Sequence, residues 1–495
     1  MSTPLPTARD ADIALLLEGT YPYVAGGVSS WVHQMILGFP EYRFACIFIG
    51  SRRSDYGEPL YPLPDNVVHV ETHYLHDTAP DRAATPRPLA GDPAAIAQVA
   101  AFHAQLRAAS EGEAGSEGLS AALMQQLTTP GIDETQFLHG KASWDYITEQ
   151  YRAHCTDPSF VDYFWTVRAL HQPIWQLHRI AQSMLPAKLY HSISTGYAGL
   201  LGSLLKARTG RPFLLSEHGI YTKERRIDLL ASDWLADNRD LFQKDPTQIS
   251  YFRELWIRFF GSLGRIGYDA ADHTVALFET NRQRQLEDGA DASRSSCIPN
   301  GIDLPRFSRL TAQRPATPTP VLCLIGRVVP IKDIKTFIRA MRIVVSRIPD
   351  AQGWIAGPAE EDPEYATECR ALVASLGLTA SVQFLGMKRV DTLFPEIGVT
   401  VLSSISEALP LVLLESMAAG VPVVATDVGA CRDIVEGRLA EDRALGSCGA
   451  VVRIADPEAL ARAALDLLSH PERWHAAQHA GQARVAQYYR DSQML

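Results

Sequence analysis

The chain of 495 residues is poor in cysteine and has no cysteine pair at a spacing that binds metal. Its seven cysteines are scattered along the sequence, their number is odd, and no Cys-x-x-Cys motif occurs. A disulfide framework and a zinc site are therefore both unexpected, and this cysteine usage fits a reducing compartment.

Positive charge and long apolar runs are lacking as well. The formal net charge of −10 argues against a broad surface for nucleic acid or anionic membranes, although it leaves room for one local basic pocket. No run of about 18 apolar residues is free of both charge and proline, so we expect no membrane span. Arg9, Asp10 and Asp12 precede only a very short apolar run, which makes a poor secretory signal. We expect a cytoplasmic protein.

The sequence does contain a repeated pattern of short apolar runs, each followed by a loop and a helical pattern. Two domains are expected from the length. Continuous apolar strands that alternate with helices predict α/β domains with parallel sheets covered on both faces. The expected strands lie at residues 12–18, 44–50, 67–73, 189–194, 213–219 and 273–278 in the first half, and at 321–326, 353–357, 381–386, 399–404, 421–426 and 449–454 in the second.

Residues 298–320 separate the two series of strands and form the predicted domain boundary. Asn300-Gly301 is a turn signal, and four prolines follow by residue 320. The sequence therefore predicts two doubly wound domains, with a cleft between them that faces the carboxyl ends of both sheets. Neither series starts with a GxGxxG motif, which disfavours a nicotinamide oxidoreductase.

Residues 74–188 interrupt the first series of strands. They lack strand patterning and are rich in Ala, Gln, Leu and aromatic residues, so we expect a helical insertion here. A lid, a surface for a partner and a packing element are all compatible with this pattern.

Residues 406–425, SEALPLVLLESMAAGVPVVA, place two glutamates in a segment that is otherwise almost wholly apolar. We expect a loop that carries Glu407 at the end of a strand, then a helix with Pro410 in its first turn and Gly420 just past its end. Glu407 could merely cap that helix. Glu415 lies inside the helix, where a buried carboxylate needs a hydrogen-bond donor. Hydroxyl groups of a sugar or a ribose are such donors.

Two basic residues follow the first strand of the second series. Arg327 lies at the strand end, and Lys332 lies about where the next helix begins. A lysine in a first helical turn opposes the helix dipole, but an anion bound at that place makes the lysine favourable. The alternative is a surface ion pair, because Asp333 could satisfy the lysine alone.

The first series carries two weaker signals. Gly26 and Gly27 precede a helix and let the backbone approach a ligand closely, although a plain strand-to-helix turn explains them as well. Glu217 and His218 end a predicted strand and would point into the cleft. The alternative is a histidine that is bonded to its neighbours.

Taken together, these motifs resemble glycosyltransferase family 4, and the likeness covers most of the chain. It rests on GGV at 26–28, EHG at 217–219, PNGID at 299–303, GRVVPIKD at 326–333 and an E-x7-E pair at 407 and 415. The long helical insertion and the segments EGTYPYVAGGVSSWVHQMI and GRVVPIKDIKTFIRAM are similar to the PelF-type branch, which is associated with Pel exopolysaccharide biosynthesis.

The resemblance implies the GT-B fold, with two Rossmann-like domains and a cleft between them. The first domain would span residues 1–305 on the acceptor side and include the insertion, and the nucleotide-sugar domain would span 306–474. A C-terminal helix over 475–495 would cross back toward the first domain.

The resemblance also implies roles for individual residues. Arg327 and Lys332 would hold the donor's diphosphate, Glu415 would accept hydrogen bonds from the ribose, and Glu407 would bind the sugar hydroxyls. His218 would face the sugar near the reacting carbon, so that the expected catalytic residues are His218, Glu407, Arg327 and Lys332. The other expected binding residues are Gly26, Gly27, Glu217, Asn300, Leu385, Met387, Ala408, Leu409, Pro410 and Leu411.

One position departs from the family pattern. The family usually has glycine directly after the first glutamate, whereas this chain has Ala408. If a positive φ is needed there, alanine costs about 1 kcal/mol or shifts the loop. The role inferred for Glu407, binding the donor sugar, is the one that depends on this position.

The implied reaction is a retaining glycosyl transfer without a metal. Negative charge grows on the β-phosphate of the leaving nucleotide, and Arg327 and Lys332 can stabilise it in place of a metal ion. The only plain DxD sequence, Asp10-Ala11-Asp12, precedes the first strand, so we expect no metal and no cofactor beyond the nucleotide-sugar donor. We expect same-face attack, in which the departing phosphate takes the acceptor's proton, and domain closure that excludes water.

The expected substrates are a uridine diphosphate sugar and a growing exopolysaccharide, and the expected partner is a membrane-bound synthase complex. Two other functions stay open from the sequence. A non-hydrolysing nucleotide-sugar 2-epimerase shares the architecture but needs acid–base carboxylates, for which only Glu217 and Glu407 are at hand. A nucleotide-binding subunit with lost activity is the other, and Ala408 is the feature that supports it.

Overall fold

The computed structural model describes residues 5–77, 89–112, 115–128, 132–232, 234–240 and 248–495. The chain forms two compact units, Met1–Cys297 and Ile298–Leu495. The boundary lies at the start of the predicted 298–320 boundary segment and slightly before residue 305. The last helices belong to the second unit, and the return of residues 475–495 toward the first domain stays a prediction.

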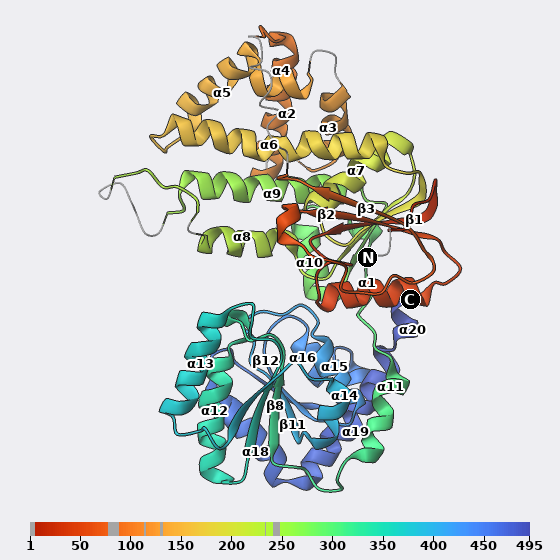
Figure 1. The fold of residues 1–495 in the computed structure, drawn as a ribbon, viewed down its shortest axis with the longest axis vertical. Coiled ribbons are helices and arrows are strands. Elements are labelled where there is room, and N and C mark those ends of the chain that lie inside the picture. Colours follow the sequence, from red (N-terminus) through yellow and green to blue (C-terminus); the bar gives the residue numbers. More distant parts are fainter. Residues whose placement is uncertain (1–4, 78–88, 113–114, 129–131, 233, 241–247) are drawn as a thin grey trace. The chain divides into compact units, whose positions relative to one another are not determined.

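A seven-stranded parallel sheet forms the core of the first unit, in the order β3-β2-β1-β4-β5-β6-β7 (Figure 1). All six strands predicted for this half are present, and the sequence missed β7 because its residues, Ser-Ser-Cys, are not an apolar run. The strands are β1 (Ala11–Glu18), β2 (Phe44–Gly50), β3 (Val67–Tyr74), β4 (Ala187–Ser192), β5 (Phe213–Glu217), β6 (His273–Ala276) and β7 (Ser295–Cys297).

The strands in the middle of this sheet are mostly buried. Every residue of β2 is buried, as expected of a parallel strand that is covered on both faces. One covering helix, α7, approaches the sheet closely, since a Cβ added at Gly202 would lie 2.2 Å from the ring of Phe213. The helices outside the insertion are α1 (Gly27–Gly38), η1 (Arg53–Asp55), α7 (Tyr197–Thr209), α8 (Tyr221–Ala231), α9 (Tyr251–Ala270), α10 (Glu279–Glu287) and η2 (Ala292–Arg294).

The predicted insertion is helical in its described part. Its helices are α2 (Pro93–Glu111), α3 (Leu119–Thr128), α4 (Glu134–His139), α5 (Lys141–His154) and α6 (Phe160–Ser183). Helices α3 and α6 pack on α7, and α2, α3 and α6 pack on α9, so the insertion forms a further layer over the helices that cover the sheet (Figure 1). Residues 78–88, 113–114 and 129–131 of the predicted range lie outside the described residues.

The second unit is built on a six-stranded parallel sheet in the order β10-β9-β8-β11-β12-β13. All six predicted strands are present: β8 (Val321–Ile325), β9 (Gln352–Ala356), β10 (Val382–Gly386), β11 (Val399–Leu402), β12 (Val423–Thr426) and β13 (Gly449–Val452). The helices are α11 (Leu304–Ser308), η3 (Arg309–Gln313), η4 (Pro330–Lys332), α12 (Ile334–Arg347), α13 (Pro363–Ser375), α14 (Val390–Leu393), η5 (Phe394–Glu396), α15 (Leu411–Ala418), α16 (Cys431–Glu436), α17 (Ala440–Arg443), α18 (Pro457–Ser469), α19 (Pro471–Tyr488) and α20 (Asp491–Met494).

A buried arginine fixes α19 to the rest of the second unit. The side chain of Arg484 is fully buried, and its Nε donates to Oδ1 of Asp442 at 2.5 Å. Its other nitrogens donate to the backbone carbonyls of Val435 at 2.7 Å and Gly446 at 2.8 Å. A buried charge is tolerated only when it is paired and hydrogen-bonded in this way.

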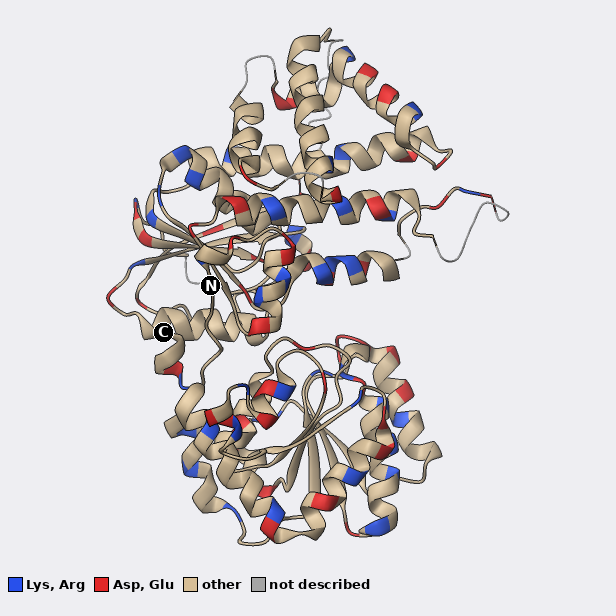
Figure 2. Cartoon of the chain, turned by 180° about the vertical axis from the view of Figure 1, so that it is seen from behind, with Lys and Arg blue, Asp and Glu red and all other residues tan. Residues whose placement is uncertain are grey.

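Residues of both charge signs occur in each of the two units. Figure 2 shows Lys and Arg interspersed with Asp and Glu along the helices of each unit. Among the described helices, none is both long and apolar enough to cross a bilayer.

Candidate functional site

The second sheet has a point where its strand order reverses, which is where open parallel sheets bind ligands. From β8 the chain proceeds to β9 and β10 on one side, and then to β11 on the other side. The loops after β8 and β11 are joined at this point. The amide of Ile405 donates to the carbonyl of Ile331 at 2.8 Å, and Oγ of Ser403 donates to the carbonyl of Lys332 at 2.9 Å.

Lys332 lies in this junction and pairs with a carboxylate from the other loop. Its Nζ is 2.5 Å from Oε1 of Glu407. Asp333 adopts a left-handed conformation with φ 43°, and its carboxylate accepts a hydrogen bond from the amide of Thr336 at 3.2 Å, which caps α12. The alternative that Asp333 alone satisfies the lysine is therefore wrong, because the carboxylate that pairs with Lys332 is Glu407.

Glu407 is held on both sides. Besides Lys332, it accepts a hydrogen bond from Oγ of Ser404 at 2.6 Å. The side chains of Lys332 and Glu407 are only 20% and 13% exposed. An ammonium group has three N–H donors, and within the described chain only one of them is used, which leaves two directed donors for an anion.

The backbone after Glu407 needs glycine at a position other than the one expected. Ala408 is not among the residues with positive φ, so alanine carries no left-handed strain there. Gly429, with φ 53°, packs against this loop, and an added Cβ would lie 2.3 Å from the carbonyl oxygens of both Glu407 and Ala408. The sequence analysis missed Gly429 and Ser404. The signal for Gly429 was its place in the loop after the strand at 421–426.

Glu415 is a partly buried carboxylate that accepts no side-chain hydrogen bond within the described part of the chain. Burial raises its pKa from 4.5 to about 7, opposed by the positive charge of Arg306 and reinforced by Asp391. Arg306 is itself committed to Asp391, with Nε 3.1 Å from Oδ1. No side chain in the described part of the chain donates a hydrogen bond to Glu415. The expectation that its donor comes from a ligand stays open to test.

The helix that carries Glu415, α15, begins at Leu411, as predicted, and Pro410 lies just before its first turn as the N-cap. Leu409 is buried and closes the loop before the helix. Gly420 has φ 75°, and the amide of Val421 donates to the carbonyl of Ser416 at 2.8 Å, which is the predicted glycine-terminated helix end.

Four further residues of the second unit were predicted to bind the donor: Arg327, Leu385, Met387 and Asn300. Arg327 follows β8, and its Nη1 is 2.6 Å from Oε1 of Glu361, with both side chains about half exposed. Leu385 lies at the end of β10, and Met387 follows it with 75% of its surface exposed. Asn300 is buried, and its Oδ1 has no hydrogen-bond partner within the described chain.

In the first unit, Glu217 is fully occupied by protein donors. Its Oε1 accepts from Oγ1 of Thr195 at 3.1 Å and from the amide of Tyr221 at 3.3 Å. Its Oε2 accepts from the hydroxyl of Tyr268 at 2.5 Å and from Nε2 of Gln285 at 3.0 Å. Glu217 is 1% exposed, and burial raises its pKa. Glu217 therefore acts as an internal brace at the end of β5, because its hydrogen bonds connect this strand end to the segments that carry the donors.

His218 is buried beside Glu217 and keeps an unused ring nitrogen. Its ring meets that of Trp31 edge-on at 4.5 Å between centroids, and Nε2 has no partner within the described chain. Burial, with His191 nearby, lowers the pKa of His218 to about 3. A neutral imidazole can accept or donate a proton in a hydrogen bond, so His218 has a free polar atom, as a ligand-facing residue would.

The first sheet also reverses its strand order, between β1 and β4, and Glu18 lies there. Its carboxylate accepts from the hydroxyl of Tyr221 at 2.8 Å and the amide of Ala198 at 3.1 Å. The sequence analysis missed Glu18, whose signal was an acidic residue at the end of an apolar strand. Gly26 and Gly27 start α1, and a Cβ on either would meet no atom within 4 Å, so close packing inside the protein does not require these glycines.

Two family models match the chain. Residues 11–293 match the family described as domain of unknown function DUF3492, and residues 319–470 match glycosyl transferases group 1. D-inositol 3-phosphate glycosyltransferase of Mycolicibacterium vanbaalenii is 31% identical over 221 residues, covering 40% of this chain and 49% of the relative. The enzyme of the same name from Geodermatophilus obscurus is 33% identical over 226 residues, covering 42% and 49%. The chain thus spans about half the length of the curated relatives it matches.

Solved structures show the fold over nearly the whole chain. HepE from Anabaena, in complex with UDP and glucose, has a TM-score of 0.56 at 14% identity, covering 98% of this chain and 97% of HepE. Sucrose-phosphate synthase from Thermosynechococcus elongatus has a TM-score of 0.55 at 18% identity, covering 98% and 96%. With its two Rossmann-like parallel-sheet domains, the chain has the GT-B fold.

Proposed function

We propose that this chain, which belongs to the DUF3492 family and carries a group 1 glycosyltransferase domain, transfers a hexose or N-acetylhexosamine from a nucleotide diphosphate sugar to a growing polysaccharide. One observation carries the proposal. At the reversal point of the second sheet, the protein places a lysine with unused N–H donors and follows it, one loop later, with a partly buried glutamate that receives no hydrogen bond from a described side chain. A pyrophosphate and a ribose are complementary to these two groups.

Lys332 and Arg327 would neutralise the charge that develops on the leaving phosphate. Lys332 can bind a phosphate oxygen without leaving Glu407, since only one of its N–H groups is engaged. Arg327 is paired at a half-exposed site, where exchange of Glu361 for a phosphate costs little. These two cations support a metal-independent reaction. The UDP and glucose bound by HepE support uridine as the base.

Glu407 and Glu415 would bind hydroxyl groups and would not attack the sugar. Glu407 is already hydrogen-bonded to Lys332 and Ser404, which fixes it and weakens it as a nucleophile. Retaining glycosidases place two carboxyl groups about 5–5.5 Å apart, one of them as the nucleophile. We therefore propose that the acceptor attacks from the same face as the leaving group, with retention of configuration, and that the departing phosphate takes the acceptor's proton. Mass spectrometry that finds a glycosyl adduct on Glu407 would refute it.

The acceptor and partner follow from the resemblance to the PelF-type branch. We propose a Pel-like exopolysaccharide as the acceptor and a membrane-bound synthase complex as the partner. The rival reading as an inactive subunit depended on Ala408 straining the loop, and the ordinary backbone at Ala408 supports an active site instead.

A calorimetric screen of nucleotides tests this proposal. UDP, UDP-glucose and UDP-N-acetylglucosamine are titrated into the wild-type chain and into the Lys332→Met and Glu415→Gln variants. We expect at least one of them to bind, and each variant to weaken binding by about tenfold or more, as for loss of a charge-assisted hydrogen bond. Lys335→Met is the matched control, because Lys335 is paired with Glu368 on the outside of the same unit. Equal losses in Lys335→Met and Lys332→Met would contradict the assigned site.

Turnover separates the candidate reactions. The proposed metal-independent transferase should hydrolyse its donor slowly without acceptor and should keep its activity in the presence of EDTA. Interconversion of the donor sugar without any acceptor would identify an epimerase instead.

A further inference from the structure

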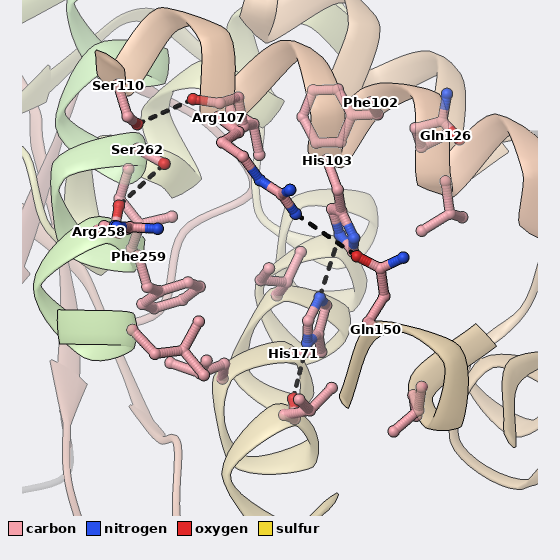
Figure 3. Close-up of a pocket in the computed structure, with 18 of the residues that line it drawn as sticks. Phe102, His103, Arg107, Ser110, Gln126, Gln150, His171, Arg258, Phe259 and Ser262 are labelled. Atoms are coloured by element: carbon pink, nitrogen blue, oxygen red, sulfur yellow. Dashed lines mark hydrogen bonds between the residues drawn. The ribbon is translucent and has the colours of Figure 1, made fainter. Parts of the chain in front are cut away.

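The helical insertion forms a cavity of about 550 Å³ in the first unit (Figure 3). Its walls come from α2, α3, α4, α5 and α6 of the insertion and from α9 of the layer beneath. Protein interiors are close-packed and rarely leave spaces of this size, whereas pockets for small ligands measure about 300–1,000 Å³. The proposed transferase function makes no use of this cavity.

Most of the cavity wall is apolar. Phe102 of α2, Leu123 of α3, Leu170 and Trp175 of α6 and Leu263 of α9 all line it, and each is itself buried. Apolar walls contributed by several helices favour a hydrocarbon group, because binding removes apolar surface from water on both sides.

The polar side chains in one wall have their protons committed to each other. Nδ1 of His171 donates to the carbonyl of Val167 at 2.7 Å, so Nε2 of this ring is an acceptor. His103 therefore donates through Nε2 across 3.3 Å, and its Nδ1 accepts from the hydroxyl of Tyr146 at 3.1 Å. Burial lowers the pKa of His103 to about 3, so this row of hydrogen-bonded side chains stays neutral. This wall offers neither charge nor a free N–H to a ligand.

Two lining serines are committed as well. The hydroxyls of Ser110 and Ser262 donate to the carbonyls of Leu106 and Arg258 in their own helices, at 2.8 and 2.9 Å (Figure 3). They add no free donor to the cavity.

Arg107 is the exception, because it brings a positive charge and hydrogen-bonds to no carboxylate within the described residues. Its guanidinium contacts Nε2 of His154 at 3.2 Å and Oε1 of Gln150 at 3.5 Å. The carboxylate of Glu111, four residues further along α2, also lines the cavity. In the described part of the chain, no carboxylate forms an ion pair with it. Arg258, the other arginine of the wall, is paired with Glu254. The cavity thus combines an apolar interior with one arginine, Arg107, that forms no ion pair within the described residues.

We propose that this cavity binds an anionic amphiphile, with a hydrocarbon chain between α3, α6 and α9 and a phosphate or carboxylate head at Arg107. The chain buries its surface against the apolar wall, and the planar guanidinium holds the head through two parallel hydrogen bonds. The site lies wholly in the first unit and is independent of the nucleotide site proposed for the second.

Binding of simple probes to the full chain tests the head-group assignment. Dodecyl phosphate, dodecanol and inorganic phosphate are titrated into the wild-type chain and into Arg107→Gln below the critical micelle concentration. We expect dodecyl phosphate to bind best and Arg107→Gln to weaken it by about tenfold, while binding of dodecanol is unchanged. Arg152→Gln, an exposed arginine of α5 outside the cavity wall, controls for the change in net charge. Equal binding of inorganic phosphate and dodecyl phosphate overturns the hydrocarbon site, and so does the absence of any binding.

A brominated probe tests where the hydrocarbon chain lies. Bromine quenches tryptophan fluorescence at contact distance, so 11-bromoundecanoate should quench the wild-type chain and lose this effect in Trp175→Phe. Leu263→Phe, which adds volume to the wall, should weaken binding while circular dichroism shows a folded protein. Quenching that persists in Trp175→Phe, or binding that Leu263→Phe leaves unchanged in a folded chain, refutes the assignment. Binding of UDP should be the same in all of these variants, which keeps this test separate from that of the proposed function.

Discussion

Nζ of Lys332 lies 2.5 Å from Oε1 of Glu407, although 75 residues separate the two in the chain. The pair joins the loop after β8 to the loop after β11. It therefore has two roles: it holds the two loops together, and it positions the charged side chains of the site. Its two roles can be separated by experiment, because stability is measured without a ligand and affinity with one.

A double-mutant cycle on this pair should show strong coupling. Lys332→Met leaves Glu407 mostly buried with only Ser404 as a donor, whereas the double variant with Glu407→Gln removes both charges. We expect a coupling energy of about 1–3 kcal/mol in urea unfolding of the second unit. Additive effects of the two single variants would show that the pair does not stabilise the loops.

Binding of a nucleotide sugar should release protons near neutral pH. The free Glu415 has a pKa raised to about 7 by burial, so about half of it is protonated at pH 7. Ribose hydroxyls donate to the charged form and lower this pKa on binding. Affinity for UDP-glucose should therefore rise by about tenfold from pH 6 to pH 8, with roughly half a proton released at pH 7. Calorimetry in buffers of different ionisation enthalpy measures both quantities.

Glu415→Gln is the control for this effect, because its side chain does not titrate. The variant should bind UDP-glucose with the same weakened affinity at pH 6 and pH 8. Proton uptake by the wild-type chain would have the wrong sign for a carboxylate that receives hydrogen bonds from the ligand.

Gly429→Ala should disturb the loop that presents Glu407. The new Cβ would lie 2.3 Å from two carbonyl oxygens of that loop, and the residue has φ 53°. We expect a loss of about 2–4 kcal/mol in stability, together with weaker nucleotide binding. Gly377→Ala is a matched control, because Gly377 has φ 67° in the same unit but no atom within 4 Å of the added Cβ.

The control should lose only about 1 kcal/mol, the cost of the left-handed conformation. If both variants lose the same stability and bind equally well, the contact between Gly429 and the loop has no part in shaping the site.

Replacing Glu217 should show whether its hydrogen bonds stabilise the first unit. Glu217→Ala removes the carboxylate to which four donors are hydrogen-bonded, so we expect a loss of about 3–5 kcal/mol in the unfolding free energy of the first unit. Glu217→Gln keeps one carbonyl oxygen, and its NH₂ can meet Oε1 of Gln285, which is buried without a partner. The expected loss is about 1 kcal/mol. Similar, small losses in both variants would contradict the role as a brace.

The parallel sheets could be predicted because their strands are continuous apolar runs. All twelve predicted strands are present, and the one addition, β7, has three residues that an apolar pattern does not mark. Glycine at 420 also ended its helix as predicted, since a positive φ is a local requirement that local sequence reveals. Such features depend on a residue and its near neighbours.

Contacts between distant loops could not be predicted in the same way. Lys332 was expected to bind a phosphate or to pair with the adjacent Asp333. The fold pairs it with Glu407 from the loop after the neighbouring strand β11, and phosphate binding stays a prediction. Glu217 was expected to face a ligand, and the fold surrounds it with donors from four different segments. The strain considered for Ala408 is absent, because Ala408 has no positive φ; the left-handed residue against this loop is Gly429. Each of these outcomes depends on which loops the sheet order places together.

The position of Arg484 sets an order of events during synthesis. The second unit cannot neutralise Asp442 or complete the hydrogen bonds around it until this arginine has left the ribosome, long after Cys297 has emerged. The first unit has a core of its own and can form early, since domains generally fold as units from the N-terminus. The nucleotide half of the molecule should therefore mature after translation of α19, and nascent chains stalled before residue 484 should resist proteases only over their first unit.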